Sequence, residues 1–163
     1  MKCILLAAGT SGRILSISKG NPKPLIKIKK KTLIERNISW LKTFGIKDIT
    51  INLFFKPQLI INEVKKVSKK VQIHFSLEKK LLGTAGAVKK IQNQLGTNFL
   101  VIYSDNLLSF DIKEFINFHL EKKNHHQKCR HFSCAMPVDY IFIWQNAWAI
   151  LIWQACRLGT WKS

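Results

Sequence analysis

Short apolar runs and helix-spaced apolar stripes alternate through the first three quarters of the chain. Lys2–Ala7, apolar after its first residue, is typical of a strand buried on both faces of a sheet. Further strands are predicted at 48–53, 71–75 and 99–103, and helices at 32–44, 59–67, 84–95 and 112–119. Strands separated by helices of this length need crossover connections, which predicts an α/β fold with a mostly parallel sheet. The loops that follow the strands then lie along one edge, where such sheets bind ligands.

The loop after the first strand carries the first candidate site. Residues 7–13 read Ala-Ala-Gly-Thr-Ser-Gly-Arg, and Lys23 follows between two prolines. Glycines let backbone N–H groups approach a phosphate, and Arg13 adds a forked, permanently charged donor set. The prolines stiffen the chain around Lys23 and lower the entropy lost in aiming its ammonium group. By itself a Gly-x-x-Gly-Arg turn is equally consistent with a structural loop, and it is not a Walker loop, since no Gly-Lys-Ser/Thr follows.

Four segments in order resemble one enzyme family. Leu6–Gly9, Arg13 and Pro22–Leu25 are together similar to the signature of sugar-phosphate nucleotidyltransferases, which include mannose-1-phosphate guanylyltransferases and glucose-1-phosphate thymidylyltransferases. The other three segments are 32–49, similar to the family's first helix and second strand, 82–87, similar to its nucleobase loop, and 103–106, similar to its metal-binding turn. The resemblance implies a Rossmann-like three-layer fold of the nucleotide-diphospho-sugar transferase type.

The resemblance also implies a reaction and a role for each matching residue. An NMP group would pass from an NTP to a sugar 1-phosphate with release of pyrophosphate, and guanylyl transfer to a mannose- or heptose-type phosphate is the expected version. Arg13 and Lys23 would be catalytic, the first on the leaving pyrophosphate and the second on the α-phosphate. Asp105 would hold Mg²⁺, a cation that prefers carboxylate, water and phosphate oxygens. The nucleotide-binding residues would be Ala7, Ala8, Gly9, Ser11, Gly12, Gly83, Thr84 and Ala85.

Some of these residues have structural explanations too. Asp105 could be a turn residue, and the small residues of 83–87 could mark a tightly packed helix start. Glu78 matches a frequently acidic position and receives no role. Two positions depart from the family pattern: Ser11-Gly12 replaces Gly-Thr or Gly-Ser, and Ser104 replaces a glycine before the metal aspartate. If position 104 needed a positive φ, serine there would cost about 1–3 kcal/mol.

The composition changes after Asn124. Residues 125–163 contain four of the five tryptophans and three of the four cysteines but a single acidic residue, Asp139. We find no strand or helix periodicity in them. The sequence therefore predicts two parts: 1–124, the N-terminal part of a nucleotidyltransferase domain that is truncated after about residue 124, and 125–163, an aberrant tail. A frameshift or gene disruption is the favoured origin of this tail, and a hydrophobic partner-binding segment is the alternative.

The formal net charge is +18, and most of it comes from lysine. Such a charge favours anionic partners, but a lysine-biased genome would produce it as well. We favour the second explanation, because the lysines do not form an arginine-aromatic stripe of the kind that RNA-binding proteins use. The resemblance implies an NTP and a sugar 1-phosphate as partners, and we expect neither a membrane nor a nucleic acid. The four cysteines are too few for a disulfide framework in a chain of this length, and the apolar start is at the short edge for a secretion signal, so a cytoplasmic location is expected. A catalytically inactive nucleotide-binding fragment is the alternative function.

Overall fold

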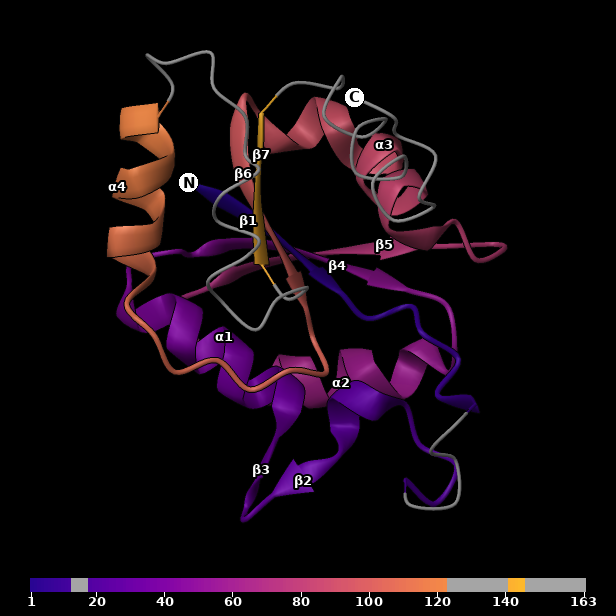
Figure 1. The fold of residues 1–163 in the computed structure, drawn as a ribbon. Coiled ribbons are helices and arrows are strands. Elements are labelled where there is room, and N and C mark those ends of the chain that lie inside the picture. The colour runs from indigo at the N-terminus through magenta and orange to yellow at the C-terminus, as the bar shows by residue number, and fades with distance from the viewer. Residues whose placement is uncertain (13–17, 123–140, 146–163) are drawn as a thin grey trace.

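The computed structural model describes residues 1–12, 18–122 and 141–145 of the 163-residue chain. Arg13 and most of the predicted tail lie outside the described residues. The described part is built around a five-stranded sheet with the strand order β5-β4-β1-β6-β7 (Figure 1). A separate two-stranded sheet, β2-β3, lies next to α1 (Leu33–Thr43) and projects away from the large sheet (Figure 1).

Four strands of the large sheet are parallel and lie close to the predicted positions. They are β1 (Lys2–Leu6), β4 (Asp48–Leu53), β5 (Gln72–Leu77) and β6 (Asn98–Tyr103). β1 pairs with β4 on one side and β6 on the other, so that Ile4 lies opposite both Thr50 and Val101. The prediction of an α/β fold with a mostly parallel sheet is confirmed.

Helices cover both faces of the sheet and make three layers (Figure 1). The helices are α1 (Leu33–Thr43), α2 (Pro57–Val67), α3 (Gly83–Leu95) and α4 (Ile112–Lys122). Leu5 faces a core that contains Ile34 of α1 and Ile60 of α2. Its neighbours in β1, Ile4 and Leu6, face a second core on the other side of the sheet, against α3. β1 is thus buried on both faces, as its apolar run predicts. In the described ranges, no helix is long and apolar enough to cross a membrane.

The start and end of α1 show how local chemistry sets the boundaries of these elements. The Thr32 hydroxyl accepts the backbone N–H of Glu35 at 3.3 Å and caps the first turn. Gly45 takes a φ of +78° just beyond the last turn, where glycine tolerates a left-handed backbone. In the sequence Thr32 is a start signal and Gly45 is a stop signal, which explains why the predicted helix boundaries are close to the observed ones.

A short hairpin between the first loop and α1 was not expected from the sequence. β2 (Lys27–Ile28) pairs antiparallel with β3 (Lys31–Thr32). Lys29 takes a φ of +57° in the turn, a conformation for which Gly or Asn is the usual sequence signal. The lysine-rich segment has neither residue at that position, so composition alone gave no indication of the turn.

The structure describes one strand within residues 125–163, where the sequence shows no strand or helix periodicity. β7 (Ile141–Gln145) pairs antiparallel with β6, and Ile143 lies opposite Leu100. Its residues form a continuous apolar run, the same signal that marks β1, but no periodic pattern flanks it. The free edge of β6 can accept such a strand through backbone hydrogen bonds, a tertiary effect that periodicity does not encode. The division into 1–124 and an aberrant tail remains a prediction.

The Cys3 thiol gives a chemical test of this fold. Cys3 is fully buried between the paired strands and α1, and burial raises the pKa of its thiol above the usual range. Because the thiolate is the reactive form, iodoacetamide at pH 8 should leave Cys3 unmodified in the native protein and modify it in urea. Peptide mass spectrometry locates the modification. Rapid native labelling of Cys3 would contradict the buried position of β1.

Candidate active site

The carboxyl ends of the parallel strands bring four loops to one edge of the sheet. β1, β4, β5 and β6 all run in the same direction, so the residues that follow them lie at that edge. All of the predicted site residues in the described part follow β1, β5 or β6. The topology therefore places them near one another, as the sequence analysis expects.

Lys23 and Asp105 form the centre of this edge. Lys23 begins the 3₁₀ turn η2 (Lys23–Leu25), and Asp105 lies two residues after β6. Lys23 Nζ lies 3.7 Å from Asp105 Oδ2, with side-chain exposures of 27% and 35%. A partly exposed ion pair of this length contributes little to stability, about 0–1 kcal/mol. The pair is informative for another reason: it brings an ammonium and a carboxylate, 82 positions apart in the sequence, together at a partly exposed position.

The glycine-rich loop has room for a ligand on its outer side. A Cβ built on Gly9 or Gly12 would meet no atom within 4 Å, apart from their chain neighbours. Ala7 and Ala8 are buried and form the inner wall of the loop. The N–H of Ala7 donates to Asn52 Oδ1 at 2.8 Å, so this donor is committed within the protein. Phosphate contacts would therefore come from the donors further along the loop.

Ser11 occupies an unusual position in this loop. Its φ is +61°, in the left-handed region, where a residue other than glycine costs about 1–2 kcal/mol. It is only 3% exposed, and its hydroxyl accepts the backbone N–H of Lys23 at 2.9 Å. The departure from the family pattern at Ser11-Gly12 therefore places a buried hydroxyl against the second half of the signature.

A network of buried hydrogen bonds links the loop after β1, the end of β4 and the loop after β5. The Asn52 side chain accepts from Ala7 and donates through Nδ2 to Glu78 Oε1 at 2.8 Å. Glu78 Oε2 accepts the backbone N–H of Leu82 at 3.0 Å. Asn52 and Glu78 are 3% and 8% exposed, so water competes little for these bonds. The network connects the glycine-rich loop to the start of α3.

The predicted base loop forms the first turn of α3. Gly83 has a φ of +69°, and the hydroxyls of Thr84 and Tyr103 lie 2.9 Å apart. A Cβ on Gly86 would lie 2.8 Å from the Leu82 Cβ, so packing alone requires glycine there. Gly83 faces open space and needs its glycine for the backbone angle. Both explanations from the sequence, a packed helix start and an accessible backbone, thus apply within one loop.

The strain considered for Ser104 does not arise. Ser104 is not among the described residues with a positive φ, and it is fully buried. Its hydroxyl donates to the Leu6 carbonyl at 2.7 Å, and its own carbonyl accepts from Asn37 Nδ2 at 3.0 Å. The serine side chain therefore ties the end of β6 to the end of β1 and points away from any ligand on the outer side.

Asp105 has no companion ligands for a metal ion within the part of the chain that the structure describes. There, no group of three or more His, Cys, Asp or Glu side chains could hold a metal ion. A lone, partly exposed carboxylate fits Mg²⁺, which keeps several waters and takes phosphate oxygens as further ligands. It does not fit a structural zinc site, which needs three or four protein ligands.

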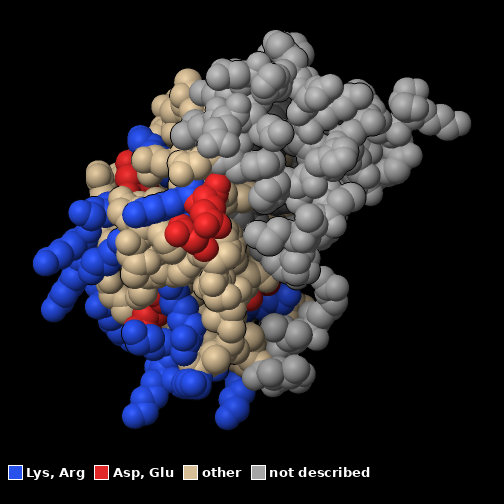
Figure 2. Space-filling model, turned by 60° about the vertical axis from the view of Figure 1, so that its left-hand side comes forward, with Lys and Arg blue, Asp and Glu red and all other residues tan. Residues whose placement is uncertain are grey.

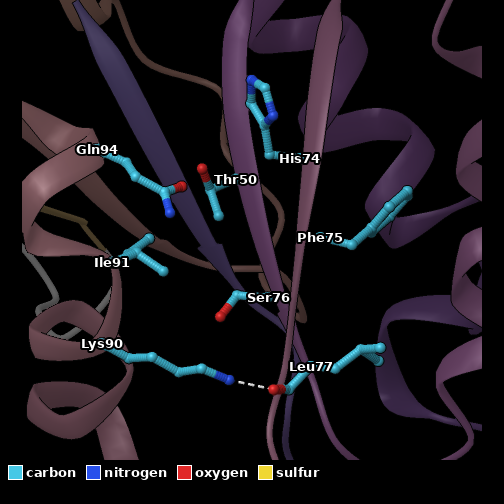
Figure 3. A pocket seen from close by; sticks show the side chains of 8 residues that line it. All are labelled: Thr50, His74, Phe75, Ser76, Leu77, Lys90, Ile91 and Gln94. Atoms are coloured by element: carbon cyan, nitrogen blue, oxygen red, sulfur yellow. Dashed lines mark hydrogen bonds between the residues drawn. The ribbon is translucent and has the colours of Figure 1, made fainter.

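A groove in the described part of the chain lies away from these residues. It has a volume of about 240 Å³ between β5 and α3, with Thr50, Ser76 and Gln94 on its walls (Figure 3). The Lys90 ammonium donates to the Leu77 carbonyl at one end of it (Figure 3). None of the predicted site residues lines this groove, so it carries no part of the candidate site.

The basic side chains are not gathered into a single stripe on the face that Figure 2 shows. Lysines and arginines project from several parts of this described surface, with smaller groups of acidic side chains among them (Figure 2).

A comparison with protein families shows to which family the chain belongs. The family model described as nucleotidyl transferase matches residues 2–135, which is most of the chain. The chain belongs to the nucleotidyl transferase family. The match extends beyond residue 124, where the sequence analysis ended the resemblance.

Curated relatives within this family share one printed activity. The chain is 34% identical over 129 residues to the mannose-1-phosphate guanyltransferase of Yarrowia lipolytica, and 32% identical over 124 residues to that of Saccharomyces cerevisiae. These alignments cover 76% and 73% of this chain but 35% and 34% of the relatives. The chain therefore spans about a third of the length of the curated relatives that it matches.

Solved structures show the same fold. HddC from Yersinia pseudotuberculosis, in a complex with GMP-PN, has a TM-score of 0.67 and 31% identity. A putative glucose-1-phosphate thymidylyltransferase from Bacillus anthracis has a TM-score of 0.66 and 26% identity. The alignments cover 74% and 76% of this nucleotidyl transferase chain, and 54% and 51% of those chains. The Rossmann-like fold expected from the sequence is thereby confirmed.

Sequence reasoning missed two residues of this edge and left a third without a role. Asn52 is predicted only as part of a strand, Tyr103 as a strand end that opens the segment similar to the metal-binding turn, and Glu78 only as a matching acidic position. A signal for Asn52 did exist, because a polar residue near the end of an otherwise apolar buried strand needs a partner. Its partners could not be named from the sequence, since they come from the loops after other strands.

Replacing Asn52 by Ala should destabilise the fold by about 3 kcal/mol. The change leaves the Ala7 N–H and one Glu78 oxygen without their partner, and buried unpaired groups cost about 1–3 kcal/mol each. Urea denaturation followed by circular dichroism measures the loss. Asn62→Ala, at an exposed position of α2 paired with Gln58, is the control and should stay within about 0.5 kcal/mol of the wild type. Equal effects of the two variants would contradict the buried network.

Proposed function

We propose that this edge binds a nucleoside triphosphate and carries out NMP transfer to a sugar 1-phosphate, with release of pyrophosphate. The observation that carries the proposal is the 3.7 Å approach of Lys23 to Asp105 beside an open glycine-rich loop. A cation for the phosphate and a carboxylate for a metal ion then lie where a triphosphate on that loop would pass. Membership of the nucleotidyl transferase family supports this assignment.

In this proposal the triphosphate lies against the backbone of the glycine-rich loop. Gly9 and Gly12 leave space on the outer side, and Ser11 contributes its backbone rather than its buried hydroxyl. Lys23 stabilises the α-phosphate while the sugar phosphate attacks it in line, and Arg13 offsets charge on the departing pyrophosphate. The transition state gains negative charge at these oxygens, so fixed cations stabilise it more than they stabilise the bound substrates.

Asp105 would hold Mg²⁺ together with water and triphosphate oxygens. The fit rests on its partly exposed carboxylate, the type of oxygen ligand that Mg²⁺ prefers beside water and phosphate. When bound, Mg²⁺ neutralises charge on the phosphate oxygens and helps to orient them. Without the cation, the Lys23 ammonium balances the Asp105 carboxylate, and this weak pair opens at small cost.

The nucleobase would lie against Gly83, Thr84 and Ala85 at the start of α3. Guanine and a mannose- or heptose-type phosphate are the proposed substrates. The printed activity of the curated relatives, mannose-1-phosphate guanyltransferase, supports this choice, and so does the GMP-PN complex of HddC. Such substrates are available in the cytosol, which is the proposed location.

The chain aligns with only part of each relative, so nucleotide binding and nucleotidyl transfer are tested separately. Purified protein with Mg²⁺, GTP and a panel of sugar 1-phosphates should release pyrophosphate, measured with a coupled phosphate assay. GTP binding without release would support the alternative of an inactive nucleotide-binding fragment. The absence of binding to any NTP would refute both forms of the proposal.

Two substitutions test the roles of the central pair. Lys23→Ala should lower kcat/KM for pyrophosphate release by about 10²–10³-fold, because one preorganised charge at a transition state contributes that much. Asp105→Asn should raise the Mg²⁺ concentration needed for half-maximal release. Lys66→Ala is the control, since Lys66 pairs with Glu63 near the end of α2. A loss in the control as large as that in Lys23→Ala would show that general positive charge, not this site, matters.

A further inference from the structure

The Ser11 hydroxyl has a structural cost that its surroundings do not otherwise explain. The residue takes a φ of +61°, a conformation that favours glycine, and the family pattern has glycine there. Serine nonetheless occupies the position, with its side chain buried and 3% exposed. A buried hydroxyl in a strained position is expected to make an interaction that glycine could not make.

Its partner is the backbone of Lys23. The Lys23 N–H donates to Ser11 Oγ at 2.9 Å, across 12 positions of sequence. Pro22 and Pro24 have no N–H, so Lys23 owns the only backbone donor of the Pro-Lys-Pro segment. The hydroxyl therefore takes the one donor through which this segment can be fixed to the glycine-rich loop.

The segment itself is rigid, so a hydrogen bond to one of its backbone atoms fixes the point from which the Lys23 side chain extends. The prolines restrict the backbone, and the turn is closed by hydrogen bonds from Leu25 to the Pro22 carbonyl at 2.9 Å and from Ile26 to the Lys23 carbonyl at 3.0 Å. Pro24, within this turn, is buried. At the far end of the Lys23 side chain, the ammonium lies beside Asp105.

We propose that Ser11 is a positioning residue for Lys23. Its hydroxyl holds the Lys23 backbone and so aims the ammonium at the place of the α-phosphate, an alignment on which transfer rates depend steeply. This inference rests on the proposed function for its catalytic consequence, but the link between Ser11 and Lys23 can be tested without any nucleotide.

Amide hydrogen exchange tests the link directly. In the wild-type chain the Lys23 amide should be protected, and Ser11→Ala and Ser11→Gly should each speed its exchange by about tenfold or more. Ser68→Ala, which removes an equally small hydroxyl at the end of α2, is the control and should leave the Lys23 amide unchanged. Fast exchange of this amide in the wild type, or unchanged exchange in both Ser11 variants, would overturn the proposal.

Affinity for Mg²⁺-GTP tests the consequence. Loss of one hydrogen bond predicts an affinity about 2- to 12-fold weaker in Ser11→Ala. Ser11→Gly should weaken binding as well, although glycine relieves the backbone strain. Binding by Ser11→Gly that equals or exceeds that of the wild type would mean that only backbone conformation matters at this position, and the proposal would fail.

A double-mutant cycle separates positioning from a general effect on the loop. If Ser11 acts through the Lys23 ammonium, Ser11→Ala should have no further effect on GTP affinity in a Lys23→Ala background. Independent, additive losses would refute the positioning role. If the wild type bound no NTP, the proposed function would fail, while the exchange experiment would still decide the link between the two residues.

Discussion

The position of β1 between two parallel neighbours is the constraint on which the rest of this structure depends. β4 and β6 pair with it on either side, and its side chains alternate between two cores. Burial on both faces leaves the strand few alternatives in register, because a shift by one residue would exchange the two cores. With β1 fixed, the loops after the parallel strands lie at one edge, and the residues of the candidate site are on the loops after β1, β5 and β6.

Side-chain hydrogen bonds to the backbone then hold these loops at defined positions. Asn52 holds the N–H of Ala7, and Ser104 holds the carbonyl of Leu6. Ser11 holds the N–H of Lys23 in the same manner. Each of the three side chains is buried, where a hydrogen bond has little competition from water and an unmade one is costly. These bonds engage the loop from the protein side, whereas a Cβ built on Gly9 or Gly12 would meet no atom within 4 Å apart from their chain neighbours.

The fold was predictable from the sequence where local signals and tertiary environment agree. The four parallel strands and four helices follow from apolar periodicity, and Thr32 and Gly45 mark the limits of α1. The predictions failed where a local signal was missing and the tertiary environment alone set the structure. Lys29 turns the small hairpin without the usual turn residue, and β7 has a short apolar run but no flanking periodic pattern, so that its pairing depends on the edge of β6.

By itself the sequence determined the strand-helix alternation and, through an ordered set of motifs, the family and most of the residues at the candidate site. Apolar spacing and glycine positions are local properties, and a single chain displays them directly. Only the tertiary structure decided that Lys23 reaches Asp105, that Asn52 joins Ala7 to Glu78, and that the Ser11 hydroxyl faces inward. These contacts join residues 12 to 82 positions apart, and their geometry exists only once the sheet has brought the loops together.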